Sequence, residues 1–299
     1  MFKKGDPSDA SNYRPIVIIS SLAKILTSMI NRRLTTWAEE NGKLCKEQFG
    51  FRRQKSTTDC IFILHSMIQL SFSRRKPIYG AFVDYARAFD STNHDGLWYK
   101  VHRSGVSSKI LNIIRSLYYK IKLCVRADLV RNDTRESDDY FFKPQSGVLQ
   151  GEVISAFLFT LFVNDLPSVI NSPDDDLLEL CVTFLMYADD MCCLSTSREG
   201  LQATLNQLSE YCDKWGLTVN TGKTKCIAFR RNGRFYDKDK WTYKNEPLET
   251  VKEFRYLGYT FSSSGSFCAG TKYLRMSALK AMFHVRSFCY SYCELSIKT

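Results

Sequence analysis

The sequence predicts an α+β fold, in which helices are layered on a small and largely antiparallel sheet. Three observations indicate this class. Residues 198–215 carry apolar side chains at helical spacing, residues 78–83 form a short and mostly apolar strand, and residues 181–194 place two apolar arms around a polar turn. The chain has 299 residues, of which 44% are hydrophobic, so it can bury a large core in one domain or in two closely packed lobes.

The helix over residues 198–215 has the strongest signals at both ends. We predict a capping box between Thr196 and Glu199 at its start, and Gly216 marks its end. The same criteria predict amphipathic helices over residues 22–37, 57–68 and 107–117, and a hairpin with strands 125–129 and 140–142. The first of these helices carries an apolar stripe from Leu22 to Trp37.

The turn Tyr187-Ala188-Asp189-Asp190 carries two adjacent carboxylates. Because aspartate is a favoured turn residue, a plain polar turn is one interpretation of this pair. The other is a divalent metal site, since neighbouring carboxylates stay ionised only when a cation offsets their repulsion. Asp84, at the end of the strand 78–83, favours the metal site, because a buried acid needs a partner. We therefore expect Asp84, Asp189 and Asp190 to form a cluster that holds two metal ions.

Charge and cysteine content narrow the class of function. The net charge of +11 and the pI of about 9.1 come from basic residues spread along the chain, which suits a long polyanion such as nucleic acid. Eleven cysteines without a Cys-x-x-Cys pair, and no signal peptide, predict a reducing intracellular compartment. The longest apolar stretch, residues 153–163, is too short to span a bilayer.

Ordered sequence blocks identify a family. They are Asn12-Tyr13-Arg14-Pro15-Ile16, Gln48-Phe49-Gly50-Phe51-Arg52, Ser56-Thr57-Thr58-Asp59, Phe82-Val83-Asp84 with Ala88-Phe89-Asp90, Gly147-Val148-Leu149-Gln150-Gly151, Tyr187-Ala188-Asp189-Asp190, Gly216-Leu217-Thr218-Val219-Asn220 with Lys223-Thr224-Lys225, and Tyr256-Leu257-Gly258. In this order and spacing, the chain resembles the reverse transcriptase domain of non-LTR (LINE-type) retrotransposons. The resemblance implies the palm and fingers of a right-hand polymerase, with a truncated thumb.

The resemblance assigns catalytic roles. Asp84, Asp189 and Asp190 match the family's metal-binding carboxylates, which implies two Mg²⁺ ions, with Mn²⁺ as the other candidate ion. Lys223 matches a lysine that either protonates the leaving pyrophosphate or simply contacts phosphate. Asp90 is expected to act locally, as a helix cap or ion-pair partner.

The resemblance also implies a site for substrates. Arg14 matches an arginine that holds the triphosphate, Phe89 a bulky gate that excludes a 2′-hydroxyl, and Gln150-Gly151 a block that contacts the nucleotide sugar and the template. Tyr256-Leu257-Gly258 matches the primer grip. The implied partners are an RNA template, a DNA primer and deoxynucleoside triphosphates, with no membrane. Arg52 and Arg53 are weaker candidates for phosphate or template contact.

The expected organisation is fingers over residues 1–80, palm over 81–265 and the start of the thumb over 266–299, with both ends truncated relative to the family. Ser155-Ala156 stands where the family commonly has Ser-Pro, which weakens a helix start. Three hypotheses follow: an RNA-directed DNA polymerase, an inactive retroelement remnant that still binds nucleic acid, and a non-catalytic RNA-binding or splicing accessory protein. The intact carboxylates favour the first.

Overall fold

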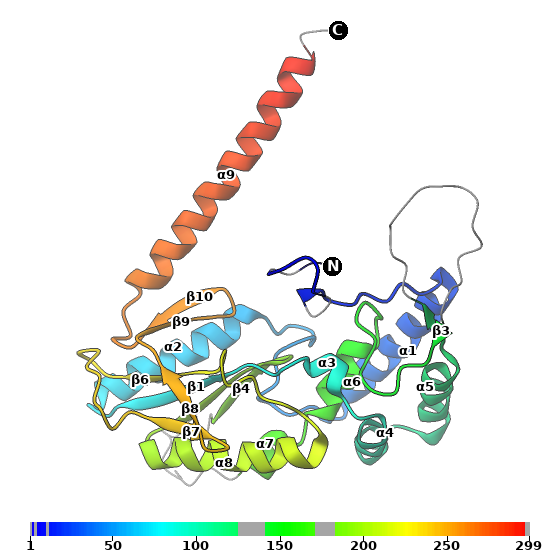
Figure 1. Ribbon diagram of the computed structural model, residues 1–299, viewed down its shortest axis with the longest axis horizontal. Helices are drawn as coiled ribbons and strands as arrows, with labels where there is room; N and C mark the ends of the chain where they lie inside the picture. Colours follow the sequence, from blue (N-terminus) through cyan, green and yellow to red (C-terminus); the bar gives the residue numbers. More distant parts are fainter. Residues whose placement is uncertain (1, 3–4, 10–11, 125–140, 171–182, 297–299) are drawn as a thin grey trace. The chain divides into compact units, whose positions relative to one another are not determined.

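The computed structural model describes residues 2, 5–9, 12–124, 141–170 and 183–296. The chain forms two compact units that alternate along the sequence (Figure 1). Unit 1 comprises residues 1–54, 85–170 and 208–219, and unit 2 comprises residues 55–84, 171–207 and 220–299. The predicted hairpin strand 125–129 and the acidic run 174–176, which we expected to be a loop, lie outside the described residues.

Unit 2 is built on a six-stranded sheet with the strand order β4-β5-β1-β6-β8-β7. Its strands are β1 (Ile78–Val83), β4 (Phe184–Tyr187), β5 (Asp190–Ser195), β6 (Lys225–Phe229), β7 (Trp241–Tyr243) and β8 (Glu246–Thr250). Neighbouring strands are antiparallel except β6 and β8, which are parallel. The prediction of a largely antiparallel sheet is confirmed.

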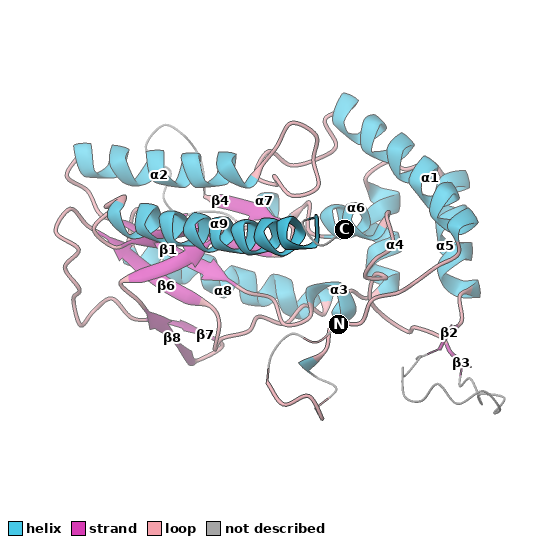
Figure 2. Ribbon diagram, turned by 90° about the horizontal axis from the view of Figure 1, so that it is seen from above, coloured by secondary structure: helices cyan, strands magenta, loops and turns pink. Residues whose placement is uncertain are grey.

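Strand β1 lies inside this sheet, between β5 and β6, and all six of its residues are buried. A strand that is covered on both faces needs apolar side chains on both, which explains why its sequence is a continuous apolar run rather than an alternating one. Helix α2 (Thr57–Ser73) begins with a capping box between Ser56 and Asp59 and packs against β4, and Figure 2 shows it beside the strands.

A second hairpin, β9 (Glu253–Tyr256) and β10 (Tyr259–Ser262), follows the sheet in unit 2. It leads into the long helix α9 (Cys268–Ser296), which contacts β10. A Cβ atom on Gly270 would overlap the ring of Tyr259, so glycine allows the ring to lie against the helix backbone.

Helix α8 (Arg198–Trp215) matches its predicted range. Leu201, Leu205, Leu208 and Cys212 are buried, and Gly216 ends the helix with a φ of +72°. The predicted capping box was wrong by one residue. The helix begins at Arg198, and the hydroxyl of the preceding residue, Ser197, accepts a hydrogen bond from the backbone N–H of Gly200 at 2.9 Å.

Unit 1 is mainly helical. Its elements are α1 (Ser21–Glu40), α3 (Ala88–Ser91), α4 (His94–Arg103), α5 (Ser108–Lys120), α6 (Ser155–Phe162), α7 (Leu166–Val169) and the short strands β2 (Leu123–Cys124) and β3 (Phe141–Phe142). The predicted helices over 22–37, 57–68 and 107–117 therefore exist as α1, α2 and α5. Helix α6 begins at Ser155, and its N-cap residue Ile154 makes no side-chain hydrogen bond.

The apolar stripe of α1 is only partly buried. Leu22 is 80% exposed, and Ile25 and Met29 are also exposed, whereas the buried positions of this helix are Thr27, Leu34 and Ala38. The periodicity of a helix defines an apolar face but does not specify whether another element covers it. In the described chain only the second half of that face is covered.

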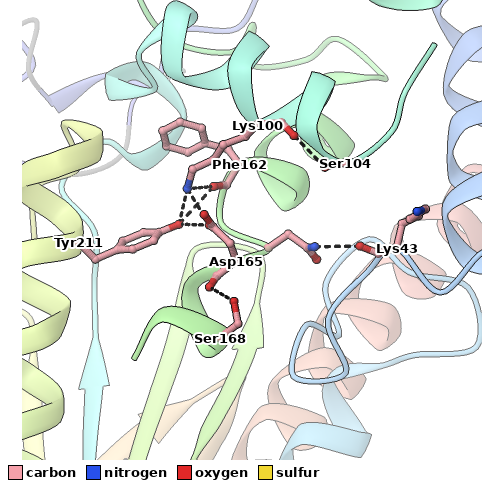
Figure 3. Close-up of polar contacts among 8 residues, drawn as sticks. Lys43, Lys100, Ser104, Phe162, Asp165, Ser168 and Tyr211 are labelled. Carbon is pink, nitrogen blue, oxygen red and sulfur yellow. Dashed lines mark hydrogen bonds and ion pairs between the residues drawn. The ribbon is translucent and has the colours of Figure 1, made fainter. Parts of the chain in front are cut away.

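A buried ammonium group links three elements of unit 1. Lys100 on α4 is 5% exposed, and its Nζ donates to the carbonyl of Phe162, to Asp165 Oδ1 and to the Tyr211 hydroxyl at 2.6–2.7 Å. These contacts use all three ammonium protons. The Tyr211 hydroxyl in turn donates to Asp165 (Figure 3). The network joins α4 to the turn between α6 and α7 and to the end of α8.

Burial lowers the pKa of Lys100 from 10.5 to about 8, although Asp165 opposes this shift. Between these two values the unfolded chain binds more protons than the folded chain. The free energy of unfolding should therefore rise with pH, by at most about 1.4 kcal/mol per pH unit.

We predict that Lys100→Met abolishes this rise. The measurement is urea unfolding of the wild type and the variant at about pH 8 and about pH 10. Between these two pH values, the unfolding free energy of the wild type should increase relative to that of the variant. The control is Lys109→Met, which removes an exposed lysine and should leave the pH dependence unchanged. An identical pH profile for the wild type and Lys100→Met would contradict the prediction.

Candidate active site

Strand pairing in unit 2 brings two of the predicted carboxylates together. β1 and β5 are antiparallel, with Val83 opposite Met191. The next residues outward are therefore Asp84 and Asp190, and directly opposed residues of an antiparallel pair share one face. Both line a single cavity of about 420 Å³.

The turn of the β4–β5 hairpin holds Asp189. Tyr187 pairs with Asp190, which leaves Ala188 and Asp189 as the two turn residues, and the predicted hairpin is confirmed. Ala188 has a φ of +60°, a conformation that alanine rarely adopts. Such local strain is typical of functional turns, and here it sets the position of an acidic pair.

The backbone of Asp84 makes two hydrogen bonds with the segment that precedes β6. Its N–H donates to the Thr224 hydroxyl at 3.2 Å, and its carbonyl accepts from the N–H of Asn220 at 2.8 Å. The family resemblance assigned no role to Thr224. The structure shows that its hydroxyl is the acceptor at the end of β1, a contact across 140 residues that no local pattern reveals.

The carboxylate of Asp84 has an incomplete set of partners. Its Oδ2 is buried and accepts no hydrogen bond from the described residues, and the nearest cation is Lys223 Nζ at 3.5 Å. Burial, followed by the charges of Asp189 and Asp84, raises the pKa of Asp190 to about 6. The site thus holds carboxylates that favour an added cation.

The geometry falls short of the predicted three-carboxylate cluster. Among the described residues, no group of three Asp, Glu, His or Cys side chains is placed to hold a metal ion. The charges on Asp84, Asp189 and Asp190 repel one another, and Asp84 lies near the Lys223 ammonium instead. The donors themselves, hard carboxylate oxygens of which one is buried and unbonded, fit a cation such as Mg²⁺.

The predicted primer-grip residues border the same cavity. Tyr256 and Leu257 line it, and Leu257 and Gly258 form the two-residue turn between β9 and β10. Both have positive φ, of 48° and 86°, as a type I′ hairpin requires. The Tyr256 hydroxyl donates to the carbonyl of Leu185 in β4 at 3.1 Å, which ties the hairpin to the strand that precedes the turn at Ala188 and Asp189.

The predicted nucleotide-contact residues belong to unit 1. Phe89 stacks on Phe159 with ring centroids 4.7 Å apart, which holds its ring in place. The Gln150 amide donates to Asp90 Oδ1 at 2.7 Å, so Asp90 orients Gln150 rather than serving as the helix cap or ion-pair partner that we expected. A Cβ atom on Gly151 would lie 2.9 Å from the carbonyl oxygen of Val17, and only glycine permits this close approach.

Arg14 is exposed, and the two weaker arginine candidates, Arg52 and Arg53, differ from each other. Arg52 makes a two-pronged ion pair with Glu39 at 2.6 and 2.8 Å and also donates to the carbonyls of Cys45 and Gln48. These contacts occupy the guanidinium within unit 1, so Arg52 is a structural residue in this conformation. Arg53 is exposed.

Comparison with known proteins agrees with the arrangement of these motifs. The profile of a family described as "Reverse transcriptase (RNA-dependent DNA polymerase)" matches residues 2–261. The chain belongs to the reverse transcriptase family.

Relatives of this reverse transcriptase chain are encoded by non-LTR elements. It is 29% identical to the RNA-directed DNA polymerase from mobile element jockey of Drosophila funebris, over 87% of this chain and 28% of that protein. It is 30% identical to the probable RNA-directed DNA polymerase from transposon BS of Drosophila melanogaster, over 95% of this chain and 32% of that protein. The chain therefore spans about a third or less of the length of these relatives.

Solved structures support the fold of the reverse transcriptase domain. Apo telomerase from Candida tropicalis superposes with a TM-score of 0.56 and 12% identity, over 84% of this chain and 41% of that one. Within the described residues, we find no helix with the length and apolarity needed to cross a membrane.

We predict that Thr224→Val lowers the free energy of unfolding by about 1–3 kcal/mol, because it leaves the partly buried N–H of Asp84 without the hydroxyl of the buried Thr224 as acceptor. Thr224→Ser keeps the hydroxyl and is the matched control. Urea denaturation of the three proteins distinguishes them. Equal losses in both variants would show that packing, not the hydrogen bond, explains the effect.

Proposed function

We propose that this reverse transcriptase domain is an RNA-directed DNA polymerase that extends a DNA primer on an RNA template. The observation that carries the proposal is the convergence of Asp84, Asp190, Lys223 and the Tyr256-Leu257 hairpin on one cavity within a chain of this family. In the reaction, the primer 3′-oxygen forms a bond to the α-phosphorus of the nucleotide, the bond from that phosphorus to the β-phosphate breaks, and pyrophosphate leaves.

The proposed metal ligands are Asp84, Asp189 and Asp190. Two Mg²⁺ ions, with Mn²⁺ as the other candidate, would lower the pKa of the primer hydroxyl and stabilise charge on the departing pyrophosphate. The buried, unbonded Oδ2 of Asp84 supports a role as ligand. Lys223 is a source of the proton that pyrophosphate takes up, since its ammonium group is exposed at the cavity and lies 3.5 Å from Asp84.

The remaining roles concern substrates. Arg14 would contact the triphosphate, Gln150 and Gly151 the sugar and the template, and Tyr256-Leu257-Gly258 the primer end. The hydrogen bond from Gln150 to Asp90 and the stacking of Phe89 on Phe159 support these assignments, because both side chains are held in fixed orientations. A solved telomerase, from Candida tropicalis, is described in complex with a fragment of telomeric RNA, which is consistent with an RNA template here.

We predict primer extension by the wild-type chain on an annealed RNA template with dNTPs and Mg²⁺, and a loss of at least about 100-fold in Asp189→Asn. Removing one carboxylate charge weakens metal binding at the site of phosphoryl transfer. Asp95→Asn, at an exposed position in unit 1, removes the same charge elsewhere and should retain extension.

Two outcomes would contradict the proposal. Extension by Asp189→Asn at the wild-type rate would separate the activity from this site. No extension by any of the proteins, with binding of the RNA–DNA duplex retained, would identify the chain as a remnant that keeps the fold without the chemistry.

We predict that Phe89→Ala increases the use of ribonucleotides relative to deoxynucleotides by about 10-fold or more, because the ring no longer excludes the 2′-hydroxyl. The control is Phe89→Tyr, which keeps a bulky ring and should keep the discrimination. The ratio of kcat/KM values for dNTP and rNTP incorporation measures the effect. Unchanged discrimination in Phe89→Ala would assign this ring to packing against Phe159 alone.

A further inference from the structure

Unit 2 carries a basic surface at the end of the sheet opposite Asp84. We call it the rear patch and define it by six exposed side chains: Arg75, Lys76, Arg231, Arg234, Phe235 and Lys238. Arg75 and Lys76 follow α2, and the others belong to the loop 230–240 between β6 and β7. Figures 1 and 2 show that α2 leads into β1 at the same end of the sheet at which β6 ends.

Strand register determines where the rear patch lies. Ile78, at the start of β1, pairs with Phe229, at the end of β6. Asp84 follows the other end of β1, a six-residue strand, so the patch is on the order of 20 Å away at about 3.3 Å per residue. That separation places the patch beyond the carboxylates and outside their cavity. The proposed catalytic site does not account for it.

Internal polar contacts stabilise the fold of the loop 230–240. Arg230 binds the fully buried carboxylate of Asp239 through both nitrogens, at 2.6 and 2.8 Å. Its guanidinium also donates to the carbonyl of Arg234 and lies 4.6 Å from the centroid of the Tyr236 ring. The N–H of Tyr236 donates to Asp239. The loop is thus folded around one internal ion pair.

The outer basic side chains are not neutralised. Arg75, Lys76, Arg231 and Arg234 make no ion pair with the described residues, and the only exposed acid in the loop 230–240 is Asp237. Arg75, Lys76, Arg231 and Asn232 also line a shallow cavity of about 320 Å³ that has no acidic lining residue. Such a concave set of donors suits a phosphate group.

Exposed aromatic rings lie among these charges. Phe235 and Tyr236 are each 43% exposed, and Lys238 Nζ lies 5.8 Å from the Tyr236 ring. Basic groups that follow a phosphate backbone, together with rings on which bases stack, are the pattern of surfaces that bind single strands. A duplex, whose bases are already stacked, cannot use these rings in the same way.

We propose that the rear patch binds single-stranded nucleic acid at a site separate from the catalytic cavity. The cavity at Arg75 and Arg231 takes a phosphate, and Phe235 and Tyr236 stack on adjacent bases. This inference goes beyond the proposed polymerase activity and does not depend on it, because binding is measured without any nucleotide addition.

The test is the variant Arg75→Gln, Lys76→Gln, Arg231→Gln, Arg234→Gln in the full chain. Fluorescence anisotropy with labelled oligouridylate and oligothymidylate of about 20 nucleotides, in the absence of dNTPs, measures affinity over a range of salt concentrations. We expect the Kd for at least one of the two strands to rise about 10-fold. The slope of log K against log salt should become shallower by about 0.7 for each phosphate that the variant no longer neutralises. The strand whose affinity falls more identifies RNA or DNA as the preferred ligand.

A matched control removes the same charge from unit 1. Arg103→Gln, Lys109→Gln, Lys120→Gln, Lys143→Gln alters four exposed basic residues. This control should weaken binding less than the rear-patch variant does. Equal losses of affinity in the two variants would overturn the proposal, because net charge alone would then explain the binding, and so would unchanged affinity in the rear-patch variant.

The stacking component has its own test. Phe235→Leu keeps an apolar side chain at an exposed position and removes the ring, so it should weaken single-strand binding several-fold while leaving the affinity for a duplex of the same length unchanged. Equal effects on single strand and duplex would overturn the stacking role. Thermal unfolding at the wild-type temperature establishes that each variant is folded, as expected for changes at exposed positions.

Discussion

Antiparallel pairing of β1 with β5 holds Val83 opposite Met191, and this register brings Asp84 and Asp190 to the same end of the sheet. A shift by one residue would turn one of the two carboxylates to the other face. The register is well specified because β1 is buried along its whole length and is paired on both edges. On its other edge β1 pairs with β6, and this pairing positions the Thr224 hydroxyl as the acceptor for the N–H of Asp84. One strand therefore positions both the carboxylates and the residue that binds the backbone of Asp84.

Buried charge is handled in two different ways in this chain. Lys100 in unit 1 and Asp239 in unit 2 have full sets of partners, and each fixes several segments in place. Asp84 and Asp190 at the cavity of unit 2 differ, since Asp84 has a buried oxygen without a hydrogen bond from the described residues and Asp190 has a raised pKa. Structural polar groups are normally satisfied, so unsatisfied charge that gathers at a cavity is evidence of function.

Local patterns were sufficient for several elements. The apolar run of β1, the hairpin around Ala188 and Asp189, and the helix over residues 198–215 were all predicted, because each depends on periodicity or turn chemistry within a few residues. Predictions that depended on distant neighbours were less successful. The apolar stripe of α1 is largely exposed from Leu22 to Met29, and Asp90 binds Gln150, which lies 60 residues further along the chain.

The sequence by itself determined the family of this protein, the acidic residues of the turn, and the excess of basic charge. Ordered motifs and side-chain composition carry that information without any knowledge of spatial contacts. Which residues share a surface became clear only in the folded chain. Folding joined Asp84 to Asp190 and Tyr256 around one cavity, occupied Arg52 with Glu39, and gathered Arg75 and Arg231 at the far end of the sheet. These outcomes follow from strand register and packing between segments remote in the sequence, which local patterns do not encode.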